Sequence, residues 1–191
     1  MSIMFKNGLY YKLSVLLIRM CLAFLIPSPV YAIETNVGTE TGLSLPRFVV
    51  LKSNKSNLRN GPGLKYPIKW LYTRKGYPME VIAEFENWRQ IRDIDGTEGW
   101  INENLVSGKR NVLIIGNKFS YPTKHYKLQK HEMVLLRYPN EAAHPIVRVE
   151  FGVIGNLKKC EQYWCKVTVE SYTGWIQKEN LWGVYKDETF K

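Results

Sequence analysis

The 191-residue sequence is poor in the side chains that most enzymes use for nucleophilic or metal chemistry. It has only three cysteines and three histidines, His125, His131 and His144. Neither a Gly-x-Ser-x-Gly nor a His-Glu-x-x-His motif occurs. The acids Asp93, Asp95 and Glu98 surround a hairpin-turn signal, where solvated carboxylates are common. We therefore expect a protein that is not an enzyme and that needs no cofactor and no metal.

A long uncharged apolar run is also missing, because Arg19 interrupts the apolar stretch near the N-terminus. A membrane-spanning helix needs roughly 20 apolar residues. Instead, Lys6, Lys12 and Arg19 precede the short run "MCLAFLI" (Met20–Ile26), and a small-x-small arrangement ends at Ala32. This order is typical of a secretory signal peptide cleaved after Ala32, with an uncleaved anchor as the alternative. We expect a periplasmic or secreted protein without a stable membrane span in its mature chain.

Acidic residues are outnumbered, with 27 Lys and Arg against 17 Asp and Glu. Removal of residues 1–32 leaves 24 basic and 17 acidic residues, a net charge of +7. A positive field attracts anionic partners such as cell-wall polymers, membrane surfaces or nucleic acid. Export argues against nucleic acid as the partner.

Two cysteines remain after the signal peptide, Cys160 and Cys165. In an exported protein an even pair indicates a disulfide. The pair does not complete the four ligands of a structural zinc site, and its spacing differs from that of the Cys-x-x-Cys redox motif. Two free, buried thiols beside Trp164 are the alternative.

The sequence matches itself in three places, in the same order, which indicates two copies of one module. In the first match, "LRNGPGLKYPI" and "LRYPNEAAHPI" share Leu, Arg, Pro and Ile. The second match has no gap, and the third aligns "EGWINENL" with "TGWIQKENL". The matched ranges are Leu58–Ile68 with Leu136–Ile146, Gly76–Ile91 with Gly152–Val167, and Glu98–Leu105 with Thr173–Leu181.

Both copies have the pattern of β-strands. Apolar and polar residues alternate in "MEVIAEF" and "WCKVTV". Asp95 and Gly96 stand between two strand-like runs, which predicts a hairpin. Short strands with regular turn signals favour a small barrel or sandwich.

These residues resemble the bacterial SH3-like domain. The first copy carries "SNLRNGPGLKYP", "ENWRQI" and "EGWI", and the second carries "LLR…HPI", "QYWCKV" and "TGWI" but lacks the glycines of the opening. The resemblance implies an all-β protein with two small, strongly bent SH3-like β-barrels in tandem after the signal peptide. Modules of this family are often attached to cell-wall hydrolases, where they bind peptidoglycan, and no hydrolase domain is recognisable in this sequence.

The matches and the resemblance divide the chain into six parts. They are a signal peptide (1–32), a flexible N-terminal segment (33–44), SH3-like module 1 (45–109), a linker or connecting strand (110–130), SH3-like module 2 (131–186) and a tail (187–191).

The opening "LRNGPGLKYP" predicts a turn, in which glycine supplies a positive φ and proline fixes its own φ. A phosphate-binding loop would need a following Lys-Ser/Thr and a helix, and neither is present. Part of a ligand groove is the alternative interpretation of this stretch.

Aromatic side chains are the candidates for ligand binding. Tyr66, Trp70 and Tyr72 could line a groove beside Arg59, a combination that suits a sugar or an anionic peptide. Trp88 and Trp164 occupy matching positions and lie either in the core, on a groove or at an interface between the two copies. Because copy one retains the full opening, we expect binding to depend on it more than on copy two.

The gapless match pairs Glu84 with Cys160, and Arg89 with Cys165. Each pair flanks four residues, so in a hairpin its members would lie directly across from each other, close enough for a disulfide. We predict a Cys160–Cys165 disulfide in copy two and a Glu84–Arg89 ion pair in copy one, which would be weak if it is exposed.

Two functions fit these observations. One is an exported, non-catalytic binding module that recognises peptidoglycan or its peptides in the cell envelope. The other is a structural or regulatory adaptor that binds another envelope or secreted protein.

Overall fold

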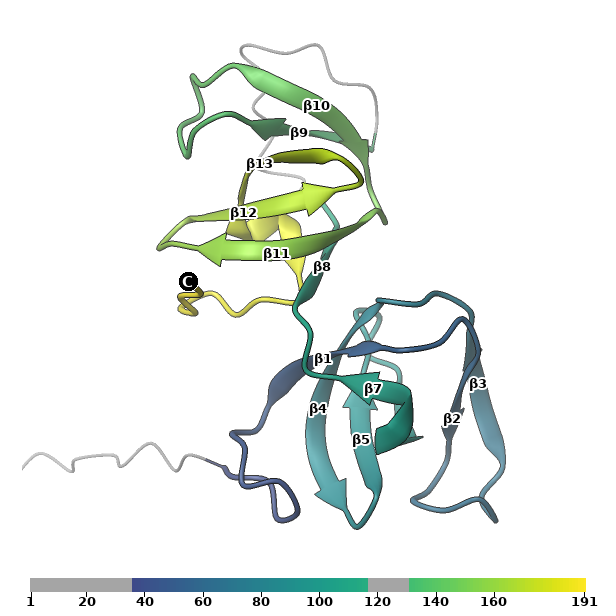
Figure 1. Cartoon of the computed structure of the whole chain (residues 1–191). Helices are drawn as coiled ribbons and strands as arrows, with labels where there is room; N and C mark the ends of the chain where they lie inside the picture. The colour runs from purple at the N-terminus through teal and green to yellow at the C-terminus, as the bar shows by residue number, and fades with distance from the viewer. Residues whose placement is uncertain (1–35, 117–130) are drawn as a thin grey trace, which may run out of the picture. The chain divides into compact units, whose positions relative to one another are not determined.

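The structure is a computed structural model, and it describes residues 36–116 and 131–191. These residues form fourteen β-strands and two single-turn 3₁₀ helices (Figure 1). The signal peptide expected at residues 1–32, and most of the linker expected at 110–130, lie outside the described residues. Within those residues, no helix has the length and apolar character that crossing a membrane requires.

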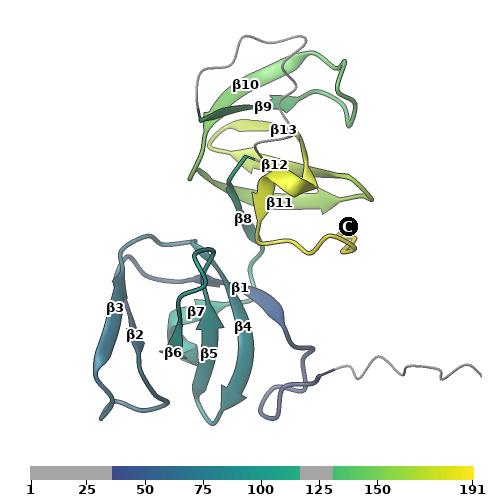
Figure 2. The same ribbon diagram turned by 180° about the vertical axis from the view of Figure 1, so that it is seen from behind.

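The first sheet is antiparallel and contains seven strands in the order β3-β2-β6-β5-β4-β1-β7. Figures 1 and 2 show its hairpins β2–β3 and β4–β5 from opposite sides. Its elements are β1 (Arg47–Leu51), β2 (Ser56–Arg59), β3 (Ile68–Tyr72), β4 (Pro78–Phe85), β5 (Trp88–Arg92), β6 (Glu98–Asn102), the helix η1 (Glu103–Leu105) and β7 (Val106–Ser107).

The second sheet has the order β10-β9-β13-β12-β11-β8-β14, which repeats the topology of the first strand for strand. Its elements are β8 (Asn111–Ile114), β9 (Glu132–Leu136), β10 (Pro145–Glu150), β11 (Ile154–Cys160), β12 (Trp164–Val169), β13 (Tyr172–Gln177), η2 (Lys178–Asn180) and β14 (Leu181–Trp182). The prediction of an all-β protein with two SH3-like units is confirmed. Neither sheet is closed by pairing of its two end strands, so each is an open, bent sheet among the described residues.

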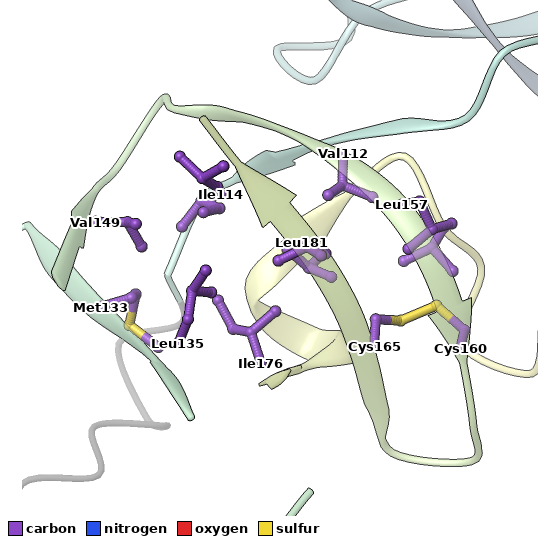
Figure 3. Close-up of a cluster of buried hydrophobic side chains, with 13 residues drawn as sticks. Val112, Ile114, Met133, Leu135, Val149, Leu157, Cys160, Cys165, Ile176 and Leu181 are labelled. Atoms are coloured by element: carbon purple, nitrogen blue, oxygen red, sulfur yellow. A yellow bond between two sulfur atoms is a disulfide. The ribbon is translucent and has the colours of Figure 1, made fainter. Parts of the chain in front are cut away.

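Each sheet encloses its own apolar core. In the first, Leu58, Met79 and Ile91 are fully buried, and in the second Leu135 and Val167 are. Figure 3 shows how the second core gathers side chains from most of the strands of its sheet. Full burial of such a side chain stabilises the fold by about 1.5–3 kcal/mol. Alternation of apolar and polar residues places one face inside in strands such as β12, whereas β1 and β9 are buried on both faces.

The predicted hairpin at Asp95-Gly96 is present between β5 and β6, which pair in antiparallel register. Gly96 has a φ of 80°, a conformation that favours glycine. The side chain of Asp93 accepts hydrogen bonds from the backbone N–H groups of Asp95 (3.0 Å) and Thr97 (2.8 Å). The Asp93 carboxylate therefore supports the turn and is buried (6% exposed), which corrects the expectation that it is solvated, whereas Asp95 is exposed as expected.

The β4–β5 and β11–β12 hairpins share one register. Glu84 lies opposite Arg89 in the first, and Cys160 lies opposite Cys165 in the second. The predicted disulfide joins Cys160 to Cys165, and both residues are buried in the core of the second sheet (Figure 3). This prediction is confirmed.

A short terminal segment is bound at the equivalent place on each sheet. On the first, residues 36–44 form a turn closed by a bridge between Val37 and Ser44, and the carboxylate of Glu84 binds this turn. On the second, the backbones of Cys160 and Phe190 exchange two hydrogen bonds, of 2.7 and 3.1 Å. The segments expected to be a flexible N-terminus and a tail thus both have hydrogen-bonded residues.

Candidate functional site

The loop between β2 and β3 holds two of the predicted binding residues, Arg59 and Tyr66. The Arg59 guanidinium donates hydrogen bonds to the carbonyl oxygens of Leu64 (3.1 Å) and Tyr66 (2.7 Å). The Tyr66 ring lies on Gly61, where an added Cβ would be 2.6 Å from a ring carbon. Both side chains therefore fold the loop onto itself.

The glycines of this loop have another role than the one expected. A positive φ was expected at these glycines, but neither Gly61 nor Gly63 has one. Gly61 is required because the Tyr66 ring approaches its backbone too closely for a side chain. In the second copy, the matching positions are Pro139 and His144, so the glycine and the tyrosine are absent together.

Trp70 and Tyr72 lie on β3, at the edge of the first sheet. Trp70 is 57% exposed, whereas Tyr72 is buried and its hydroxyl donates a 2.7 Å hydrogen bond to Asp93 Oδ2. Burial, with this bond and the charge of Asp93, raises the pKa of Tyr72 well above its usual value. A shallow hollow of about 350 Å³ beside Trp70 is also lined by Tyr77 and Asp95.

The two matching tryptophans have different surroundings. Trp88 is 8% exposed and offers little surface to a ligand. Trp164 is half-buried, packs against Val134, Leu136 and Ala143, and also lines a groove. The six predicted binding residues are thus not brought together in one site.

We call this hollow of the second sheet the Trp164 groove; it measures about 570 Å³. The β11–β12 turn, the end of β13 with η2, and the chain beyond β14 form most of its wall. The lining residues are Glu141, Gln162, Tyr163, Trp164, Gln177, Lys178, Glu179, Leu181, Val184 and Lys186.

Lys178 is a buried cation among the residues that line the Trp164 groove. Its Nζ donates hydrogen bonds to three carbonyl oxygens, those of Gln162 (3.0 Å), Lys186 (3.0 Å) and Glu188 (2.8 Å). An ammonium group has three donors, so these bonds use all of them. Lys178 consequently fixes the turn and the C-terminal segment, and it has no donor left for a ligand.

The C-terminal segment has a second anchor. The guanidinium of Arg110 forms two hydrogen bonds to the carboxylate of Glu188, of 2.5 and 3.1 Å. Burial opposes ionisation of Glu188, but the bonds from Arg110 and from the Tyr185 N–H still lower its pKa. The C-terminal segment, which contributes Lys186 to the groove, is therefore held by both Lys178 and Arg110.

Several lining residues were missed by sequence reasoning. Tyr163 is 67% exposed in the predicted turn "EQYW", and an exposed aromatic in a hairpin turn was the available signal. Gln177 and Lys178 follow the "TGWI" motif, and nothing in their spacing pointed to a groove. They reach it only because β13 pairs with β12, where Gln177 lies opposite Trp164.

Within residues 36–116 and 131–191, no group of three His, Cys, Asp or Glu side chains is arranged so that it could hold a metal ion. Cys160 and Cys165 are joined to each other, so neither offers a thiolate.

Comparison with known protein families agrees with the fold and with the presence of each motif in two copies. The family model described as "Bacterial SH3 domain" matches residues 52–108 and 129–183, which is more than half of the chain. The chain belongs to the bacterial SH3 domain family, and the predicted membership is confirmed.

One curated relative comes from Bacillus subtilis (strain 168) and bears the name "Putative N-acetylmuramoyl-L-alanine amidase YrvJ". It is 25% identical to this chain over 130 residues, which are 68% of this chain and 24% of the relative. This chain therefore spans about a quarter of the length of that relative.

Solved structures give only distant likenesses. NlpC1 from Trichomonas vaginalis has 10% identity and a TM-score of 0.31, with 78% of this chain and 50% of that chain covered. An NlpC/P60 family protein from Bacillus cereus ATCC 10987 has 11% identity and a TM-score of 0.29, with 70% and 55% covered. TM-scores this low assign neither a shared architecture nor a function.

Proposed function

We propose that this chain is an exported, non-catalytic binding protein of the cell envelope and that its ligand is peptidoglycan. The observation that carries the proposal is the pair of bacterial SH3 domain matches, which account for most of the described residues. The relative from Bacillus subtilis, whose name refers to an N-acetylmuramoyl-L-alanine amidase, supports a connection to the cell wall. The Trp164 groove supplies a concave, partly apolar surface of the kind that ligand sites use.

Export is supported by two independent features. The basic, apolar and small-residue order of residues 1–32 is that of a signal peptide. Disulfides persist in oxidising compartments, and Cys160 and Cys165 form one. With residues 1–32 removed, the net charge of +7 also favours an anionic polymer such as the cell wall.

A non-catalytic role is supported because reactive side chains are already bonded to other parts of the fold. The two described cysteines form a disulfide, and the buried acid Asp93 binds Tyr72 and a turn. None of these groups is available to attack a substrate or to exchange a proton with it.

Sedimentation with purified sacculi tests the proposal. The chain from Ile33 onward should sediment with sacculi at about 0.15 M salt and should still do so at about 1 M, where a purely electrostatic attraction is screened. Lysozyme-solubilised fragments in excess should release it. Protein that stays in the supernatant at both salt concentrations would refute peptidoglycan binding.

An adaptor that binds an envelope protein is the second candidate, and one observation favours it. Apolar side chains on β3 and the loop before it are exposed, namely Leu64 (77%), Ile68 (52%), Trp70 (57%) and Leu71 (47%). An exposed apolar edge strand is a common docking surface for another chain. Photo-crosslinking from position 70 in cells should then capture one protein, whereas capture of cell-wall material alone would reject the adaptor.

A further inference from the structure

We propose that the Trp164 groove binds the glycan of the cell wall, through uncharged sugar rings, and not its peptides. This inference rests on the proposed function, because it names the part of peptidoglycan that is recognised. The principal site then lies on the second module, whereas the complete opening motif had predicted a site on the first module.

Aromatic and apolar side chains form one part of the groove. Tyr163 is 67% exposed, and Trp164 packs against Val134 and Leu136. Leu181 and Val184 add apolar surface. A pyranose ring has an apolar face of C–H groups, and a rigid aromatic ring covers such a face without losing much conformational entropy.

Amide and carboxylate groups form the polar part. The side-chain N–H of Gln177 donates a 2.9 Å hydrogen bond to Glu141 Oε1, and that of Gln162 donates a 2.9 Å bond to the Tyr163 hydroxyl. Gln177 Oε1 also accepts a long hydrogen bond, 3.5 Å, from Asn180 Nδ2. A carbonyl oxygen has two lone pairs, so both glutamines and Glu141 still have acceptor capacity for a ligand. Such groups match the hydroxyl and acetamide groups around a sugar ring, which both donate and accept.

The charges of the groove favour an uncharged ligand. Lys178 directs its ammonium group at three carbonyl oxygens, so its donors do not face the groove. The charged side chains that line the groove are Glu141, Glu179, Lys178 and Lys186, with a formal sum of zero. A peptide with several free carboxylates would find no net positive charge here and no free ammonium donor on Lys178, an arrangement that gives it no advantage over an uncharged sugar.

The groove is preorganised by covalent and hydrogen-bonded restraints. The Cys160–Cys165 disulfide joins the two ends of the turn that carries Tyr163. Lys178 links this turn to the C-terminal segment, and Arg110 binds that segment through Glu188. A site that is already ordered loses less entropy when a ligand binds. Its volume of about 570 Å³ lies within the usual range for ligand sites, roughly 300–1,000 Å³.

The test compares two probes on the chain from Ile33 onward. The first is a tetrasaccharide of N-acetylglucosamine, and the second is the free stem peptide released from sacculi. Calorimetry should detect the tetrasaccharide and not the peptide. Tyr163→Ala and Gln177→Ala should each weaken tetrasaccharide binding on the order of tenfold, equivalent to about 1.4 kcal/mol.

Tyr172→Ala is the matched control, because Tyr172 is also an exposed tyrosine of the second module (47%) and lies at the opposite end of the β12–β13 pair. It should leave the affinity unchanged. Far-ultraviolet circular dichroism checks that all variants are folded. An equal loss in Tyr163→Ala and Tyr172→Ala would overturn the assignment of this groove.

Binding measurements with intact sacculi and with glycan strands distinguish this inference from the proposed function. Binding to intact sacculi but not to glycan strands freed of peptide would overturn the glycan inference and leave peptidoglycan binding standing. Binding to the tetrasaccharide through Tyr163 without binding to sacculi would do the reverse. Binding to intact sacculi and to freed strands, both weakened by Tyr163→Ala, would support both proposals.

Discussion

Glu84 lies directly across the β4–β5 ladder from Arg89, and both side chains are buried. Their closest charged atoms, Arg89 Nε and Glu84 Oε1, are 3.7 Å apart. Arg89 also binds Glu103, and Glu84 also binds Arg47 at 2.6 Å. The predicted ion pair is present, but it is buried and belongs to a network that extends to the partly exposed Arg47 and Glu103, so the small stabilisation expected of an exposed pair does not apply. In the second copy, Cys160 and Cys165 fill the same two positions.

The first prediction concerns Glu84→Gln. The Glu84 carboxylate accepts hydrogen bonds from the N–H groups of Glu40 (3.0 Å) and Thr41 (2.9 Å) and from the Thr41 hydroxyl (2.7 Å). A neutral amide would leave Arg47 and Arg89 without their shared counter-charge. We expect the free energy of unfolding to fall by about 3 kcal/mol in urea denaturation. Glu86→Gln, an exposed change in the same hairpin, should alter it by less than about 0.5 kcal/mol.

The second prediction is the pH dependence of the same group. Burial opposes ionisation of Glu84, but the bonds from Thr41, Arg47 and Glu40 prevail and lower its pKa from 4.5 to about 2. A folded-state pKa below the unfolded value gives stability that is complete above pH 4.5 and is lost as the pH falls toward 2. Urea unfolding of the wild type should show this loss, and Glu84→Gln should lack that part of it. Equal slopes in both proteins would contradict the assignment.

The third prediction concerns the disulfide. By chain entropy, a link that closes so short a loop stabilises the fold by about 2 kcal/mol. The double variant Cys160→Ala, Cys165→Ala should lose about this much in urea unfolding. In the unfolded, unreduced protein, an alkylating reagent should leave both cysteines unlabelled by mass spectrometry. Labelling of Cys160 and Cys165 without reductant would show that the bond does not form.

The fourth prediction concerns Lys178→Met. This change leaves three carbonyl oxygens without the ammonium donor that joins the turn to the C-terminal segment. We expect a loss of about 3 kcal/mol and faster hydrogen exchange at Phe190 and Cys160, whose backbones pair there. Lys186→Met, at an exposed lysine of the same segment, should change stability by less than about 0.5 kcal/mol. Unchanged exchange at Phe190 would refute the anchoring role.

The fifth prediction tests the contact between Gly61 and Tyr66. A Cβ at position 61 would lie 2.6 Å from the ring, so Gly61→Ala should destabilise the first module by about 1–3 kcal/mol. Removal of the ring relieves the clash, so Tyr66→Ala with Gly61→Ala should lose less than the two single changes added together. Thermal unfolding of the four proteins gives this coupling. Strict additivity would mean that Gly61 is required for another reason.

The sequence by itself determined the fold, the two copies and the disulfide. Strand alternation and turn residues are local signals, and a repeat of one module in one chain carries its own internal comparison. The register of Cys160 and Cys165 followed from the four residues between them, because a hairpin turn sets which residues face each other.

Only the tertiary structure decided which aromatic side chains are accessible. Trp88 and Trp164 match in sequence, yet one is buried and the other lines a groove, because exposure depends on segments that are distant along the chain. Gln177, Lys178 and Lys186 reach Tyr163 through strand pairing and through the C-terminal segment that Lys178 binds. Long-range contacts of this kind have no local pattern, and for that reason the groove could not be predicted from the sequence.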